Sequence, residues 1–327
     1  MKKFIVKTLF YIVPFICSII IYITLQPYIT GDIGRLGQIP FGKEYNKRLE
    51  QNYLTEKYFL DTVVSTNNNL VFDSKPDILV IGDSFSNGKE EGYQNYLTYL
   101  FHYKVVNITR TENISDPIQS AISLLNSGII DSNSCKIIIV QSVDRNTIGR
   151  LNKIDFELNF SPFHREENKK KENTKMPTLL KLFSFIRLQF YYNPIQKEPL
   201  ITKCFDHFLG NKSFTYLEDL WFLNITEQKI ETAKQNISKM NKHFSDKGIK
   251  LIFLIASDKY DVYRPFMKDY TLPVDTTTDE LDKLPDVCVI NTKYMLQKMV
   301  QDGEKDVYRI NDSHWSYKAS ETVARQI

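Results

Sequence analysis

The segment Gly82-Asp83-Ser84-Phe85 directly follows the apolar run Ile78–Ile81. A serine hydroxyl is a weak nucleophile near neutral pH. It becomes reactive when a neighbouring base takes its proton and a third group orients that base. An ordinary turn would explain the same segment. Asp83 is expected to stabilise that turn through hydrogen bonds rather than to take part in a reaction. The chemistry of Ser84 therefore depends on whether the chain supplies a base.

One of the five histidines has a setting that suits a general base. His314 lies in RINDSHWS, two residues after Asp312. With this spacing on a turn, the carboxylate can accept from one ring nitrogen while the other nitrogen faces a serine. Alone, the segment is more simply a surface loop; together with Ser84 it predicts a Ser-His-Asp triad. Surface or packing roles are expected for His102, His164, His207 and His243.

The elements that must position these residues follow from short runs rich in valine and isoleucine. These runs are Ile78–Ile81, Tyr103–Ile108, Lys136–Val140, Lys250–Ala256 and Val287–Ile290. Continuous apolar runs of this length suit strands buried on both faces, as in a parallel sheet. Helix-like stretches lie between them. The alternation predicts an α/β fold with a mostly parallel sheet.

Helix boundaries are marked by capping residues. Asp116-Pro117 is expected to begin a helix that stops near Gly128, and a second helix is expected over 226–247, before Gly248. The stretch from about 150 to 225 breaks the alternation. It is predicted to be an insertion, with a charged loop and an apolar helix that packs on the domain or, less simply, lies on a membrane surface.

The N-terminus carries an uncharged run of 18 residues, Thr8–Leu25, after Lys2, Lys3 and Lys7. Its length is close to the ~20 residues of a membrane-spanning helix. A cleaved signal peptide is the alternative, but the run is long and no small-x-small site follows. The domains expected are an anchor over 1–26, a juxtamembrane connector over 27–75 and a catalytic domain over 76–327. Basic residues before the anchor predict a cytoplasmic N-terminus and a periplasmic or extracellular domain.

The composition of the chain limits the kinds of partner and ligand that we expect. The 327 residues carry 42 Lys plus Arg and 39 Asp plus Glu, a formal charge of +3 that gives no reason to expect nucleic acid. The four cysteines lack the spacing of a zinc site. Neither a metal nor a cofactor is expected.

GDSF after the first strand, with DSHW far downstream, resembles the SGNH (GDSL) hydrolase superfamily. These motifs look specifically like its membrane-anchored, acetyltransferase-like branch, which resembles the alginate O-acetylation proteins. The segments Lys250–Tyr263 and Ile137–Asn146 also resemble that branch. The resemblance implies a flavodoxin-like three-layer fold over about 76–327, apart from the insertion.

By this resemblance Ser84 is the nucleophile, His314 the general base and Asp312 the residue that orients it. The Ser84 N–H is one oxyanion donor. The usual glycine and asparagine donors of the superfamily are not at their places, so Arg145 or Asn146 is expected to supply another donor or to contact substrate.

The expected activity is O-acetyl transfer to a cell-surface or secreted polysaccharide through an acyl-serine. The resemblance implies a multi-pass membrane acyltransferase that supplies the acyl group. Two alternatives stay open: an esterase that removes acetyl groups from such a glycan, and a non-catalytic glycan-binding subunit with the same fold.

Overall fold

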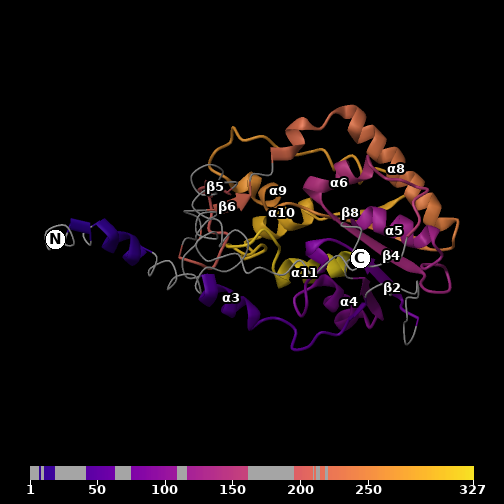
Figure 1. Ribbon diagram of the computed structural model, residues 1–327, viewed down its shortest axis with the longest axis horizontal. Helices are drawn as coiled ribbons and strands as arrows, with labels where there is room; N and C mark the ends of the chain where they lie inside the picture. Colours follow the sequence, from indigo (N-terminus) through magenta and orange to yellow (C-terminus); the bar gives the residue numbers. More distant parts are fainter. Residues whose placement is uncertain are drawn as a thin grey trace.

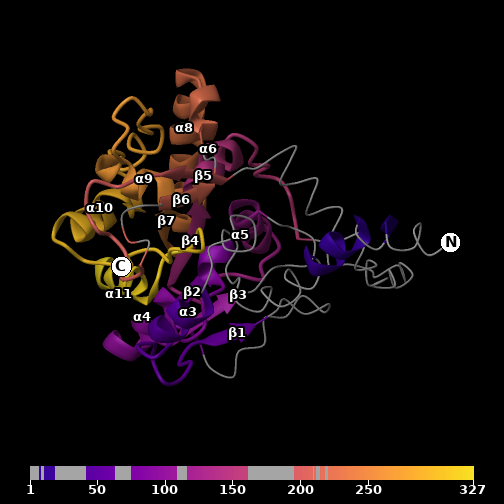
Figure 2. The same ribbon diagram turned by 90° about the vertical axis from the view of Figure 1, so that its left-hand side faces the viewer.

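The computed structural model describes residues 7–8, 11–18, 42–62, 75–108, 116–160, 195–208, 210, 214–217 and 220–327. Its centre is a six-stranded sheet in which all neighbours are parallel, in the order β1-β3-β2-β4-β7-β8. The strands are β1 (Leu60–Thr62), β2 (Ile78–Ile81), β3 (Val105–Ile108), β4 (Ile137–Val143), β7 (Lys250–Ala256) and β8 (Cys288–Asn291). The α/β fold and all five predicted strands are confirmed, and Figure 2 shows β1, β3, β2, β4 and β7 in succession.

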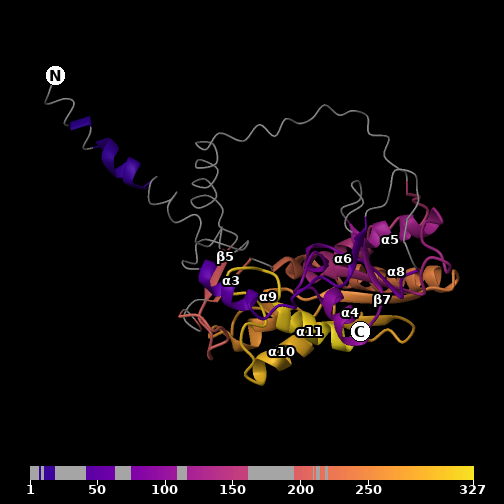
Figure 3. The ribbon, with the colours of Figure 1, turned by 90° about the horizontal axis from the view of Figure 1, so that it is seen from below.

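Helices cover both faces of the sheet. They are α3 (Gly42–Glu50), α4 (Tyr93–Phe101), α5 (Pro117–Asn126), α6 (Asp144–Leu151), α8 (Glu227–Ser245), α9 (Lys259–Tyr263), α10 (Lys293–Gln301) and α11 (Tyr317–Gln326). Short 3-10 turns are η2 (Ser84–Ser86), η3 (Leu220–Asn224) and η4 (Arg264–Phe266). Figure 3 shows α5 and α6 on one side of β7 and α4, α10 and α11 on the other, and Figure 1 labels the same helices from a second direction.

The strands are apolar throughout because each contributes to two cores. In β2, Ile78 and Val80 pack with α4, α10 and α11, whereas Leu79 and Ile81 pack with α5, α6 and α8. Alternate side chains of a strand point to opposite faces, so a strand covered on both sides needs no polar positions. This is why continuous runs, rather than alternating ones, predicted the sheet.

The predicted helix boundaries are confirmed. The Asp116 side chain caps α5, and the Thr226 side chain caps α8. Gly128 and Gly248, just past these helices, have φ of 67° and 72°. This left-handed conformation favours glycine over any residue with a Cβ.

The range expected to be a connector supplies parts of the packed domain. In α3, Tyr45 and Leu49 are buried in the core. Strand β1 adds to the edge of the sheet by pairing with β3. The domain therefore includes elements that precede residue 76.

The range expected to be an insertion, about 150–225, is described over 150–160, 195–208, 210, 214–217 and from 220 onward. It contains a small antiparallel pair, β5 (Ile195–Glu198) and β6 (Phe214–Leu217), separate from the main sheet. The predicted apolar helix falls in the part that is not described.

The predicted anchor, 8–25, is described only at residue 8 and over 11–18, and the latter residues are helical. Among the described residues, no helix is both long and apolar enough to cross a membrane. The anchor stays a prediction.

Candidate active site

Ser84 lies where β2 ends and the η2 turn begins. Its side chain is exposed, whereas that of Phe85 is buried. Asp83 caps the turn and accepts a hydrogen bond from the Phe85 N–H at 3.3 Å. The Ser84 N–H donates to no acceptor among the described residues. It is therefore available to stabilise an oxyanion.

Asp83 ties this turn to the neighbouring strand. One carboxylate oxygen accepts from the Gln141 side chain at 2.9 Å. The other accepts from the Val143 N–H at 2.7 Å and from the Arg150 guanidinium at 2.8 Å. With both oxygens engaged by β4 and α6, Asp83 is structural, as the sequence predicted. These bonds fix the serine turn at the carboxyl edge of the sheet, where sites of α/β proteins form.

The predicted base and its acid are joined by a short hydrogen bond. Nδ1 of His314 lies 2.6 Å from Oδ1 of Asp312, which also accepts from the His314 N–H at 3.0 Å. The other ring nitrogen, Nε2, is buried and has no hydrogen-bond partner in the described part of the chain. Burial opposes ionisation of Asp312, but the hydrogen bonds from the His314 ring and backbone N–H and the nearby Arg309 guanidinium outweigh it and lower the pKa of this carboxyl. Asp312 is thus a carboxylate that orients the ring.

The loop that carries His314 spans 308–315 and is closed by an antiparallel bridge between its ends. The buried Lys259 ammonium supports it by donating to the carbonyl oxygens of Arg309 and Ile310, at 2.8 and 2.9 Å. The Tyr263 hydroxyl accepts from the Tyr308 N–H at 3.2 Å. Lys259 and Tyr263, at the end of the segment Lys250–Tyr263, therefore hold the backbone of the loop that bears His314.

Ser84 and His314 line the same cavity, of about 300 Å³. The Phe85 ring stands between two aromatic side chains of the base-bearing loop, with centroids 4.8 Å from both His314 and Trp315. No hydrogen bond joins the Ser84 hydroxyl to His314 Nε2 in the described part of the chain. In ligand-free enzymes such a catalytic bond is often long and tightens only with substrate. The full lining is Ser84, Phe85, Asn87, Gly88, Glu91, Gly92, Arg309, His314, Trp315 and Ser320.

The structure places Arg145 and Asn146 outside the lining of this cavity. Both lie in the first turn of α6. The Arg145 guanidinium forms an ion pair with the buried Asp258, whose carboxylate also accepts from the Arg145 N–H at 3.0 Å. Asn146 is exposed. The arrangement does not bring these two side chains to Ser84.

Arg309 is a cation at the cavity wall that the sequence did not single out. Its guanidinium donates to the Tyr53 hydroxyl at 2.9 Å and to Glu91 at 3.0 Å, and its Nε has no partner among the described residues. Burial opposes its charge, but Tyr53, Glu91 and Asp312 outweigh it and raise the pKa of the guanidinium. The only available signal was its place in RINDSHWS, five residues before the histidine.

Two further polar groups of the lining were also missed. Asn87, at the end of η2, is exposed and next to the serine turn. The Ser320 hydroxyl, on α11, is buried without a hydrogen-bond partner among the described residues. Neither lies in a recognisable motif. Both can donate to a bound oxygen atom.

Of the other histidines, three are described, and each has the surface or packing role expected of it. His207 is buried, with its ring centroid 5.6 Å from that of Tyr45. His243 contacts the Asn126 side chain at 2.6 Å, and His102 is exposed at the end of α4. His164 lies outside the described residues.

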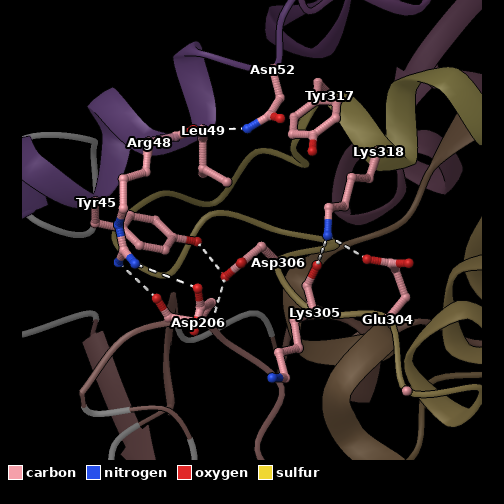
Figure 4. A pocket seen from close by; sticks show the side chains of 11 residues that line it. Tyr45, Arg48, Leu49, Asn52, Asp206, Glu304, Lys305, Asp306, Tyr317 and Lys318 are labelled. Atoms are coloured by element: carbon pink, nitrogen blue, oxygen red, sulfur yellow. Dashed lines mark hydrogen bonds and ion pairs between the residues drawn. The ribbon is translucent and has the colours of Figure 1, made fainter.

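A second, larger pocket of about 440 Å³ lies between α3 and α11 (Figure 4). Its charged groups face one another: Tyr45 donates to Asp306 at 2.8 Å, Arg48 contacts Asp206, and Lys318 contacts Glu304. The Tyr45–Asp306 bond holds α3 against the segment that precedes α11, and the Arg48–Asp206 pair joins α3 to the segment that follows β5. We interpret this pocket as a polar contact region between structural elements rather than as an active site.

Comparison of the chain with protein-family models and with curated proteins finds no match. The site is therefore defined by its own groups: an exposed serine at a strand end, a carboxylate-bound histidine and a cation around one cavity. Nucleophile, oriented base and oxyanion donors are the parts that acyl transfer through a serine requires.

Proposed function

We propose that the chain is an O-acetyltransferase that works through an acetyl-Ser84 intermediate, with His314 as general base and Asp312 as its orienting acid. The observation that carries the proposal is the 2.6 Å bond between Asp312 and His314 Nδ1, with Nε2 left free at the cavity that Ser84 lines. This arrangement sets one tautomer of the ring, with the proton on Nδ1 and a lone pair on Nε2.

In the first half-reaction, the Ser84 hydroxyl attacks the carbonyl carbon of an acetyl donor while His314 Nε2 takes its proton. The oxyanion accepts from the Ser84 N–H, and the Arg309 charge lies on the same cavity. His314 then returns the proton to the leaving group as the tetrahedral intermediate collapses. In the second half-reaction, a sugar hydroxyl gives its proton to His314 as it attacks the acetyl carbon. His314 then passes this proton to Ser84 Oγ as the bond between Oγ and the acetyl carbon breaks, which releases the acetylated sugar and restores the free serine.

The parallel sheet, the serine after β2 and the histidine loop before α11 support an SGNH-like, flavodoxin-like three-layer domain. On this proposal the acceptor is a cell-surface or secreted polysaccharide, and a multi-pass membrane acyltransferase supplies the acyl group. The domain then works on the outer side of the membrane, held by an N-terminal anchor.

A serine-directed fluorophosphonate tests the proposal directly. We expect it to label the wild-type chain at Ser84, to leave Ser84→Ala unlabelled and to label His314→Ala far more slowly. Ser245→Ala, at an exposed helix position, is the matched control and keeps wild-type labelling. Equal glycan acetylation by cells carrying wild type and Ser84→Ala would contradict the enzymatic function and favour a non-catalytic glycan-binding subunit.

Hydrolysis is the second candidate because the Ser84 side chain is exposed, which gives water a route to the acyl-enzyme. Incubation of the purified chain with an acetyl ester and an oligosaccharide acceptor separates the two reactions. Acetylated acceptor supports transfer. Release of acetate alone, at a rate that does not depend on the acceptor, contradicts transfer and supports an esterase.

A further inference from the structure

Three buried carboxyl groups converge beyond the carboxyl ends of β4, β7 and β8, outside the lining of the serine cavity. Asp144 begins α6, Asp261 lies in α9, and Asp275 lies in the segment that leads to β8. One oxygen from each lies within 4.8 Å of the others. Their exposed fractions are 0, 4 and 2 %. Such proximity is costly for three anions removed from water.

Several of these oxygens have no partner in the described part of the chain. They are both carboxylate oxygens of Asp144, Oδ1 of Asp261 and Oδ2 of Asp275. The other oxygen of Asp275 accepts from the N–H and hydroxyl of Thr277, each at 2.8 Å. That contact leaves only Oδ2 of Asp275 without a hydrogen-bond partner. Buried polar atoms are almost always hydrogen-bonded, so unpartnered oxygens from three converging side chains point to a bound ligand.

The nearby cations are already engaged with other acids. Arg145 pairs with Asp258, and Lys293 pairs with Asp279 while donating to the Asp275 carbonyl oxygen at 3.0 Å. Five carboxyl groups thus meet two cations, which leaves the three converging carboxylates without a full counter-charge. Burial is the main reason that the pKa of each of the three is raised, followed for Asp144 and Asp261 by repulsion from neighbouring carboxylates.

We propose that Asp144, Asp261 and Asp275 bind one calcium ion. Ca²⁺ takes oxygen ligands at about 2.3–2.6 Å, so ligand oxygens around it lie up to about 5 Å apart, which matches the observed spacing. Carboxylates bind Ca²⁺ through one oxygen or two, so the four unpartnered oxygens are available as ligands in a site closed to solvent. Mg²⁺ fits less well because it keeps several waters.

The three side chains form no hydrogen bonds with one another in the described part of the chain, so the proposed ion would be the link between their segments. Asp144 directly follows Val143, whose N–H binds Asp83 of the serine turn. Asp261 is two residues after Lys259, which supports the histidine loop. The calcium site is therefore a structural clamp behind both halves of the proposed active site, and it stands independently of the reaction proposed for Ser84.

Calorimetric titration of the purified full chain, stripped with EDTA and dialysed, tests the site with CaCl₂ as the probe. We expect one Ca²⁺ per chain and, at about 100 times the dissociation constant, a rise in Tm on the order of 5 °C. Absence of both the heat and the Tm shift would overturn the proposal. A Tm shift with MgCl₂ as large as with CaCl₂ would overturn the assignment to calcium.

Variants of two of the three aspartates distinguish Ca²⁺ binding at this cluster from nonspecific effects of Ca²⁺ on stability. Asp144→Asn and Asp275→Asn, which keep the side-chain shape, are expected to fold and to lose the Ca²⁺-dependent Tm shift. Asp302→Asn, at an exposed acid that contacts Lys298, is the control and keeps the shift. A full shift in both cluster variants would place the ion elsewhere and overturn the site. Fluorophosphonate labelling of Ser84 is a separate readout, so a failure here and a failure of the proposed reaction are distinguishable.

Discussion

At the scale of single residues, the proposed base depends on how Asp312 is held. Its Oδ1 receives the His314 backbone N–H and lies 2.6 Å from Nδ1 of the same residue. Two contacts from one residue leave the ring little freedom to turn, and Arg309 adds a positive charge nearby. Asp312 therefore fixes both the ring orientation and its tautomer.

Asp312→Asn is expected to lower kcat by about 10³–10⁴-fold with little change in KM, because an amide favours the wrong tautomer and removes the charge that stabilises the imidazolium. Steady-state acetyl transfer measures the effect. Asp302→Asn serves as the control at a surface acid. Unchanged kcat in Asp312→Asn would remove Asp312 from the catalytic unit.

The same carboxyl predicts a pH effect on stability. Its folded-state pKa is lowered, whereas an unfolded Asp has a pKa near 3.9. Its stabilising contribution is therefore complete above about pH 4 and declines as the pH falls toward the folded-state value. Urea unfolding at pH 6 and pH 3 should show a larger stability gap between wild type and Asp312→Asn at pH 6. An equal or larger gap at pH 3 would contradict this linkage.

At the scale of elements, the serine turn depends on the close approach of β2 and β4. A Cβ added at Gly82 would lie 2.0 Å from the Ser86 hydroxyl oxygen and 2.6 Å from the Gln141 side-chain oxygen. Both atoms belong to the hydrogen bonds that hold the turn, since Ser86 donates to Gln141 at 2.9 Å. The glycine of the GDSF motif is thus required by packing rather than by an unusual φ.

Gly82→Ala is expected to destabilise the domain by about 1–3 kcal/mol and to reduce labelling of Ser84, because the turn must shift to admit the methyl group. Gly149→Ala is the matched control. A Cβ added at Gly149 would meet no atom within 4 Å, and Gly149 lies in α6. Alanine at this position should therefore raise the free energy of unfolding by about 0.5–1 kcal/mol. Chemical denaturation measures both. A neutral Gly82→Ala would contradict the packing account.

At the scale of the whole molecule, the N-terminal helix of the domain and its C-terminal loop support one another. The Tyr45 hydroxyl, from α3, donates to Asp306 at 2.8 Å and accepts from the Ile310 N–H at 3.2 Å. Tyr45 is almost fully buried, and Figure 4 shows its hydroxyl directed at Asp306. The loop that bears His314 is therefore held by Lys259 from one side and by α3 from another.

Tyr45→Phe is expected to cost about 1–3 kcal/mol of unfolding free energy, because it leaves a buried carboxyl oxygen and a buried N–H without this partner. Urea denaturation checks the value. Tyr270→Phe, at a side chain 70 % exposed, is the control and should be neutral. A loss below about 0.5 kcal/mol in Tyr45→Phe would show that α3 does not brace the loop.

The sequence predicted the strands, because doubly covered strands are apolar throughout, and it predicted the local pair Asp312 and His314, because their spacing is short. It did not predict what depends on long-range contacts. Arg145 follows a strand end, as an oxyanion residue would, yet its partner Asp258 lies 113 residues later in the chain, after the neighbouring strand β7. The cluster of Asp144, Asp261 and Asp275 could not be predicted from the sequence either, because Asp144 is far from the other two in the chain and only the folded sheet brings their segments together.

The order of the site residues along the chain determines when they appear during synthesis. Ser84 precedes His314 by about 230 residues, and at roughly 5–20 residues per second synthesis of that interval takes on the order of 10–50 s. During this interval the nascent polypeptide holds a serine with no base, since the loop at 308–315 and its brace on Tyr45 do not yet exist. On the proposed mechanism, a chain interrupted before residue 314 lacks its general base and is expected to be inert toward acyl donors, so that reactivity arises only after the serine turn and most of the sheet have been made.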